Sequence, residues 1–144
     1  MRNLLVATDG SEGANRAIDI AAKLALAVNG TLAIVTVGSA LTEAERNQFS
    51  QFAQSEGIAD IAMTAAQQIL YDAEQRARKA GVASAETHLK WGDPTEAILE
   101  TIRLKATDAV VVGRRGRGQV SGLLLGSVSQ KLCSAAPCVA IVVP

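Results

Sequence analysis

Apolar residues along this chain follow two alternating patterns. Short runs that are continuously apolar, or that alternate with polar residues, predict strands. The longer segments between them carry apolar residues at every third or fourth position, which predicts helices with one buried face. The predicted strands are residues 4–7, 31–37, 83–90, 108–112 and 139–143. Strands that alternate with helices indicate an α/β fold: a doubly wound parallel sheet of five strands, Rossmann-like, with helices on both faces.

Residues that cap helices support this division. Ser11 follows the first strand and is predicted to cap a helix that ends at Asn29-Gly30. Asp93 followed by Pro94 predicts the start of the helix after the third strand. We expect the apolar face of that later helix to comprise Ile98, Leu99, Ile102 and Leu104.

The segment between the second and third strands is polar and rich in residues that favour helix. A capping-box pattern at Thr42 and Glu45 predicts one helix that runs to about residue 55. Glu56-Gly57 predicts a break before a longer helix over residues 58–80. The buried face of that helix is expected at Ile61, Ala62, Ala65, Ile69 and Ala73.

Length and charge narrow the class of protein. The chain has 144 residues, so we expect one domain over residues 1–144. Its core should be aliphatic, because 49% of the residues are apolar and only 3% are aromatic. Lys and Arg number 14, as do Asp and Glu, so the chain offers no general attraction for nucleic acid or an anionic membrane. No apolar run approaches the ~20 residues that span a bilayer, and the apolar start is too short for a signal peptide, so we expect a soluble cytoplasmic protein.

The two cysteines and the single histidine predict neither a disulfide framework nor a metal site. Cys133 and Cys138 lie five positions apart, and a metal site would need further ligands. We expect both to be ordinary buried thiols. His88, near the end of the third strand, is expected to be a packed or surface residue rather than a catalytic base.

A glycine-rich loop follows the fourth predicted strand. Residues 110–129 read VVVGRRGRGQVSGLLLGSVS, which is a strand, a loop and the start of a helix. The first N–H groups of a helix have no internal partner, so this arrangement can gather amides around an anion. The loop contains Gly113, Gly116, Gly118, Gly122 and Gly126, and three arginines, Arg114, Arg115 and Arg117. Glycines let the backbone come close to a ligand, and no acidic residue occurs after position 108.

We interpret this loop as a phosphate cradle. Arg115 is our candidate for a direct contact between a loop arginine and phosphate. The alternative is a surface loop without a ligand. A G-x4-G-K-[ST] loop is absent from the chain, because no glycine is followed by lysine.

The spacing G-x2-G-x9-G-S, here from Gly113 to Ser127, resembles the nucleotide-binding motif of the universal stress protein family. The resemblance extends over nearly the whole chain and is weakest between about residues 39 and 66. The opening NLLVATDGSEGANRAIDIA is similar to that family's first strand and helix, and GDP at residues 92–94 to the start of its third helix. The last segment is similar in GLLLGSVS and in APC at residues 136–138.

This resemblance implies a sheet in the order 3-2-1-4-5 and a homodimer that pairs through the last strand, Val139–Val143. It also implies that the chain binds ATP, with any Mg²⁺ carried by the phosphates. By position, the ribose and phosphates would contact Gly113, Gly116, Gly126, Ser127, Val128 and Ser129. The adenine and ribose would lie beside Ala7, Thr8, Asp9, Val37 and Val112.

The position of Asp9 agrees with such a site. In open α/β sheets, ligands bind beyond the carboxyl ends of the strands, where the strand order reverses. Asp9 follows the first strand and Gly113 ends the fourth, so the crevice is expected between these two residues. There Asp9 could accept hydrogen bonds from a ribose hydroxyl or the adenine amine. Alternatively, Asp9 only begins the following helix by accepting from the backbone of Gly10 or Ser11.

One departure from the family bears on activity. Many relatives carry a Ser-His pair between the first two motif glycines, whereas this chain has Arg114-Arg115, which adds positive charge and removes a histidine. No set of residues for nucleophilic or general-base catalysis is apparent. We therefore predict an ATP-binding stress-response protein that acts as a nucleotide-dependent switch or interaction module. The alternatives are a slow Mg²⁺-dependent ATPase in which Arg115 stabilises developing charge, and a dimeric interaction protein that binds no nucleotide.

Overall fold

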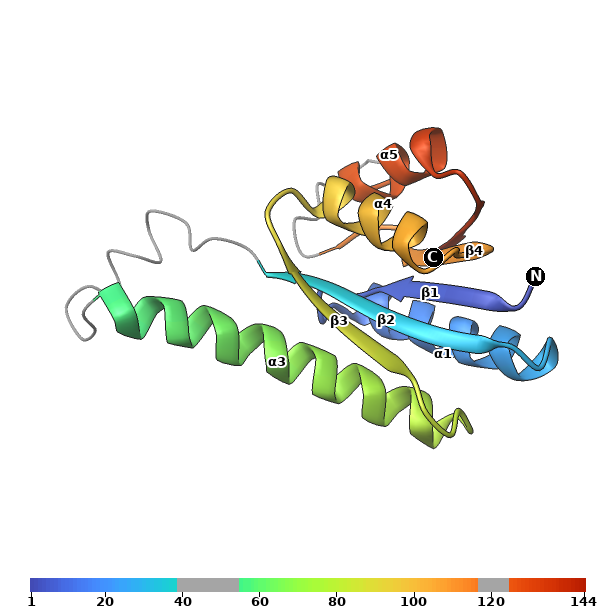
Figure 1. Cartoon of the computed structure of the whole chain (residues 1–144), viewed down its shortest axis with the longest axis horizontal. Coiled ribbons are helices and arrows are strands. Elements are labelled where there is room, and N and C mark those ends of the chain that lie inside the picture. Colours follow the sequence, from blue (N-terminus) through green and yellow to red (C-terminus); the bar gives the residue numbers. More distant parts are fainter. Residues whose placement is uncertain (39–54, 117–124) are drawn as a thin grey trace.

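The sheet has five parallel strands in the order β3-β2-β1-β4-β5, which confirms the predicted architecture (Figure 1). The computed structural model describes residues 1–38, 55–116 and 125–144. The strands are β1 (Asn3–Ala7), β2 (Thr31–Gly38), β3 (Glu86–Trp91), β4 (Ala109–Gly113) and β5 (Val139–Val143). The strand order reverses between β1 and β4, whose carboxyl ends are therefore the expected place for a ligand.

Helices lie on both faces of the sheet (Figure 1). They are α1 (Glu12–Ala27), α3 (Ser55–Lys79), α4 (Pro94–Leu104) and α5 (Ser127–Ala135). One face is covered by α1 and α3, and the other by α4 and α5. Two predicted caps are confirmed: Ser11 Oγ accepts from the Ala14 N–H at 3.2 Å, and Asp93 Oδ2 accepts from the Glu96 N–H at 3.0 Å.

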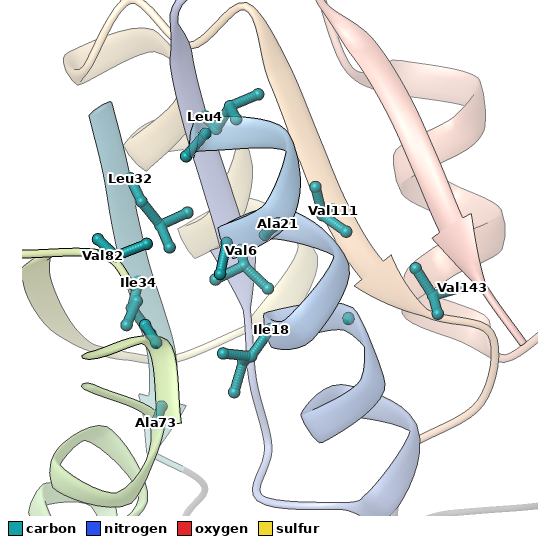
Figure 2. Packing of buried hydrophobic residues seen from close by; sticks show 14 of the residues in the cluster. Leu4, Val6, Ile18, Ala21, Leu32, Ile34, Ala73, Val82, Val111 and Val143 are labelled. Carbon is teal, nitrogen blue, oxygen red and sulfur yellow. The ribbon is translucent and has the colours of Figure 1, made fainter. Parts of the chain in front are cut away.

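Two aliphatic cores hold these layers together, one on each face of the sheet. Successive side chains of a strand point to opposite faces, so Leu4 and Val6 face α1 while Leu5 between them faces α4 and α5. Figure 2 shows the first core, where Val6 packs with Ile18 of α1. Burial on both faces explains why the central strands consist of continuous apolar runs.

The helix after β2 differs from the prediction. Because α3 begins at Ser55 and includes Gly57, the predicted break at Glu56-Gly57 is wrong. One glycine costs a helix only about 1 kcal/mol relative to alanine, which the packing of a 25-residue helix can offset. The helix predicted over residues 42–55 lies outside the described residues up to position 54.

Two predicted apolar faces are confirmed only in part: Ile98, Leu99 and Ile102 of α4 are buried as predicted, whereas the face of α3 is shifted. Among the α3 side chains that the structure describes, from residue 60 on, Ala66, Leu70, Ala73 and Ala77 are buried. Of these only Ala73 was predicted, and the predicted Ile61 is 38% exposed. Three of these four buried residues are alanines, which let α3 approach α1 and the sheet closely. In α4, Leu104 is 66% exposed, because it is the last residue of the helix and lies beyond the core.

At the amino ends of β1 and β4, the Asp108 carboxylate joins the two strands. Asp108 Oδ2 accepts from the backbone N–H groups of Arg2 and Asn3, each at 2.8 Å. These hydrogen bonds, that of Asn3 foremost, lower the pKa of Asp108 below its ordinary value of 3.8. The two bonds favour the charged carboxylate and so couple the stability of this end of the sheet to pH.

We expect Asp108→Asn to make the stability of the protein less sensitive to acid. A carboxyl group whose pKa is lower in the folded state stabilises the fold above its unfolded pKa, and this contribution is lost as the pH falls through the folded pKa. The urea concentration at the midpoint of unfolding should therefore decrease for the wild type as the pH is lowered below about 4. For Asp108→Asn it should decrease less. Glu100→Gln, a change at an exposed position of α4, is the control and should follow the wild type. Parallel curves for wild type and Asp108→Asn would contradict the prediction.

Candidate functional site

The loop after β4 is anchored through the backbone of Arg114. The Arg114 N–H donates to the carbonyl of Val143 in β5 at 2.7 Å. Its own carbonyl accepts from the Gly126 N–H at 2.7 Å and from the Ser129 hydroxyl at 2.8 Å. The start of the loop is thus bonded both to the edge strand and to the first turn of α5.

Gly126 brings the two ends of the loop together. A Cβ at Gly126 would lie 3.3 Å from the Arg114 carbonyl oxygen and 3.3 Å from Arg115 Cα, with the Gly116 nitrogen at 3.7 Å. The backbone around residues 114–116 therefore lies against the start of α5, as the sequence predicts for a cradle. Arg117, Gly118 and Gly122 lie outside the described residues.

The start of α5 presents amides that no side chain caps. Its N-cap is Gly126, which has no side chain to accept from the first turn. The first N–H groups of a helix have no partner within it, and the helix dipole adds partial positive charge there. Ser127 at this end is exposed and Val128 is half-buried. This end of α5 thus has the polarity that favours an anion.

The Ser129 side chain, which the sequence predicts to contact a ligand, makes hydrogen bonds within the protein. It is only 3% exposed, and its hydroxyl lies within hydrogen-bond distance of the Arg114 and Gly126 carbonyls, at 2.8 and 3.0 Å. Its single proton is therefore used within the protein, where it holds the loop against α5. A direct contact of Ser129 with ligand stays a prediction.

Asp9 lies between β1 and the loop. Its Oδ1 accepts from the Ser11 N–H at 2.9 Å, which turns the chain into α1. This is the bond that the helix-start interpretation of Asp9 predicts. Its Oδ2 lies against Gly116, where a Cβ would collide with it. The same carboxylate therefore starts α1 and lies against the loop, at the place between Asp9 and Gly113 where the sequence predicts a ligand.

The residues next to Asp9 in the chain hold the end of β1 in place. Thr8 is buried, and its N–H donates to the Val35 carbonyl at 2.9 Å. Its carbonyl accepts from the Thr36 hydroxyl at 2.6 Å, and its own hydroxyl oxygen accepts from the Gly10 N–H at 3.1 Å. Ala7 is half-buried. These bonds fix the end of β1 to β2 and so hold the backbone next to Asp9 in place.

Val37 and Val112 are the second-last residues of β2 and β4, the strands on either side of β1. Both side chains belong to the core under α4 and α5. Val37 is half-buried, and Val112 is 4% exposed. Val112 can therefore border a ligand chiefly through its backbone, whereas Val37 also offers a partly open side chain.

Gly13 belongs to the site and was not singled out from the sequence. A Cβ there would lie 3.0 Å from the carbonyl oxygen of Arg115. The signal was a glycine near the start of a helix whose buried face is made mostly of alanine.

His88 and the cysteines lie apart from the crevice. His88 of β3 pairs with Val35 of β2, and burial lowers the pKa of His88. Its Nε2 is 3.4 Å from Glu86 Oε1 and makes no hydrogen bond within the described structure. Cys133 is exposed, against expectation, because it lies on the open side of α5. Cys138 is half-buried, and burial raises its pKa.

The described part of the chain contains neither a cluster of metal ligands nor a membrane-spanning helix. In residues 1–38, 55–116 and 125–144, no three side chains from His, Cys, Asp and Glu come together as metal ligands would. Over the same ranges, no helix combines the length and the apolar character needed to cross a membrane.

Comparison with known proteins gives a consistent result. The profile of the universal stress protein family matches residues 1–144. The universal stress protein YxiE of Bacillus subtilis is 31% identical over 153 aligned positions, which cover 97% of each chain. A crystal structure of a universal stress protein in complex with cAMP has a TM-score of 0.75 and 28% identity, and the match covers 99% of this chain and 97% of that one. A universal stress protein from Archaeoglobus fulgidus, solved in complex with dAMP, shares the fold with a TM-score of 0.70, 21% identity and coverage of 100% and 98%.

Proposed function

Because the chain belongs to the universal stress protein family, we propose that it binds an adenine nucleotide, with ATP as the first candidate, between the carboxyl ends of β1 and β4. Relatives of the same fold have been solved with cAMP and with dAMP. In the proposed site, the phosphates lie on the loop after β4 and at the start of α5. The ribose and base lie toward Asp9 and Val37.

One observation carries the proposal: the loop backbone is held against the uncapped end of α5. The Arg114 carbonyl accepts from both Gly126 and Ser129, so the loop and the first turn of α5 form one unit. The N-cap Gly126 leaves the first amides of α5 to another acceptor. A phosphate group supplies such an acceptor and also interacts favourably with the helix dipole.

Charge and rigidity support the same assignment. Arg114 and Arg115 are half-buried beside the loop, so part of each side chain remains open to a ligand. Arginine is well suited to phosphate, because its guanidinium group presents several donors in a fixed plane.

Calorimetric titration of the purified protein tests this proposal. ATP, ADP, AMP and cAMP should be titrated separately, each with and without Mg²⁺. We expect saturable binding of at least one of them, and the order of the four affinities identifies the length of phosphate chain that the cradle accepts. No saturable heat with any of them at millimolar concentration would reject the proposal.

The alternative of a slow ATPase is tested by incubating the protein with ATP and Mg²⁺ and measuring the ADP that forms. Arg115→Ala is the control for contaminating activity.

We also propose that the protein acts as a homodimer through β5, as a nucleotide-dependent switch or interaction module of a stress response in the cytoplasm. The sheet order leaves the outer edge of β5 without a neighbouring strand in the described structure. The strand reads VAIVV, and Val139 is 50% exposed. An uncharged edge of this kind favours pairing with a second strand.

A further inference from the structure

Gly13 is the second residue of α1 and has no local reason to be glycine. The buried residues of this helix that follow it are alanines apart from one isoleucine: Ala14, Ala17, Ile18, Ala21, Ala22 and Ala25. Glycine destabilises a helix relative to alanine, because it loses more backbone freedom on folding. A residue that weakens its own element points to a requirement from elsewhere in the fold.

That requirement is contact with the loop after β4. A Cβ at Gly13 would lie 3.0 Å from the Arg115 carbonyl oxygen, closer than an ordinary van der Waals contact. In turn, a Cβ at Gly113 would lie 2.8 Å from the carbonyl carbon of Gly13 and 3.1 Å from the Ala14 nitrogen. The backbone of α1 therefore touches the loop backbone on both sides of Arg114.

We propose that Gly13 is a positioning residue of the phosphate cradle: it lets the Arg115 carbonyl rest against the first turn of α1 and so sets the direction of the Gly116 amide. The carbonyl and the N–H of one trans peptide unit point in opposite directions. Because the Arg115 carbonyl lies against α1, the N–H of Gly116 points away from that helix. This inference rests on the proposed function, since it assigns the Gly116 amide a phosphate to bind.

The loop is thus held between two helices. On the side of α5, Arg114 accepts from Gly126 and Ser129, and on the side of α1, Gly13 sets the closest approach of Arg115. A Cβ at position 13 would push the 115–116 peptide outward, whereas the bonds of Arg114 would hold its neighbour in place. The expected result is a rotated peptide unit rather than an unfolded loop.

Gly13→Ala tests the proposal through the nucleotide affinity and the melting temperature, of which only the affinity should fall. We expect the nucleotide affinity to fall about fivefold, part of the effect of a full hydrogen bond to a charged group. The melting temperature should equal or exceed that of the wild type, because alanine favours the helix. Asn15→Ala is the matched control: it lies in the same helix, about 200° around its axis from residue 13, and it should leave the affinity unchanged.

A second measurement, by nuclear magnetic resonance, needs no nucleotide. In the wild-type protein without ligand, nuclear Overhauser contacts should join the Gly13 α protons to the backbone protons of Arg115 or Gly116. Gly13→Ala should move the amide resonance of Gly116, and Asn15→Ala should not.

These measurements distinguish failure of the positioning role of Gly13 from failure of the proposed nucleotide binding. If the wild type binds no nucleotide, the proposed function fails, and the structural part of the inference is judged by the nuclear Overhauser contacts. If the wild type binds and Gly13→Ala binds equally well, or if the contacts between Gly13 and the loop are absent, the positioning role is wrong.

Discussion

Replacing Gly116 with alanine is expected to weaken nucleotide binding about a hundredfold, the effect of losing about two hydrogen bonds to charged phosphate groups. The new Cβ would collide with Asp9 Oδ2. The carboxylate cannot turn away freely, because its other oxygen accepts from the Ser11 N–H at 2.9 Å. The loop would therefore have to move, and the amides of Arg115 and Gly116 would leave their positions. Isothermal titration with the nucleotide that the wild type binds most tightly measures the effect.

The matched control is Gly30→Ala, which creates a similar collision far from the crevice. A Cβ at Gly30 would meet the backbone carbonyl of Arg2, between the amino ends of β1 and β2. We expect this variant to lose about 1 to 3 kcal/mol of stability, the usual cost of overpacking, and to bind nucleotide as the wild type does. If Gly116→Ala retained wild-type affinity, the loop backbone would not be the phosphate site. Equal losses of affinity in both variants would indicate a general effect of destabilisation.

Most of the fold could be predicted from the sequence because local patterns and tertiary packing agree. The central strands are continuous apolar runs because both faces of the sheet are covered, and Ser11 and Asp93 mark helix starts that the structure confirms. The order of the strands came from the family resemblance and not from periodicity, since strands buried on both faces look alike in sequence.

The incorrect predictions for α3 share a physical cause. In α3, apolar residues occur on several sides of the helix, so periodicity alone did not distinguish the face of Ala66 and Leu70 from that of Ile61. Close packing against α1 favours the smaller side chains, and this preference depends on the distance between elements. The break at Gly57 was wrong for a similar reason, because helix propensity is weak compared with the packing of a long helix.

At the candidate site, the sequence predicted the position of the loop but not the contacts that hold it. The spacing of the motif glycines located the loop, and the structure brings its ends together at Gly126. What the motif did not reveal is how the loop is held. The contact of Gly13 with Arg115 joins residues about a hundred positions apart in the chain, and the internal bond of Ser129 depends on the path of the loop backbone. Such contacts follow from tertiary geometry, which no local pattern records.

The second large effect concerns the edge of the sheet: Ala140→Pro is expected to convert the proposed dimer into a monomer. In a parallel pair, the N–H and C=O groups of one strand residue point to the same side, and successive residues alternate. The Val139 N–H donates to the Asp108 carbonyl at 3.1 Å, and the Val143 carbonyl accepts from Arg114 at 2.7 Å. Both residues therefore face β4, which leaves the N–H of Ala140 directed at the open edge.

Proline at position 140 would remove that outward donor and place its ring where a second strand has to approach. The hydrogen bonds to β4 should remain, because they come from the alternate residues, and proline is tolerated in an edge strand when its nitrogen faces outward. Sedimentation velocity should therefore show a monomer for Ala140→Pro at concentrations where the wild type is a dimer. In a two-fold symmetric pair, each copy presents the same edge, so one substitution acts twice. Ala140→Val, which adds bulk but keeps the N–H, should remain a dimer. A dimeric Ala140→Pro would place the interface away from β5, and a monomeric wild type would remove the dimer from the proposed function.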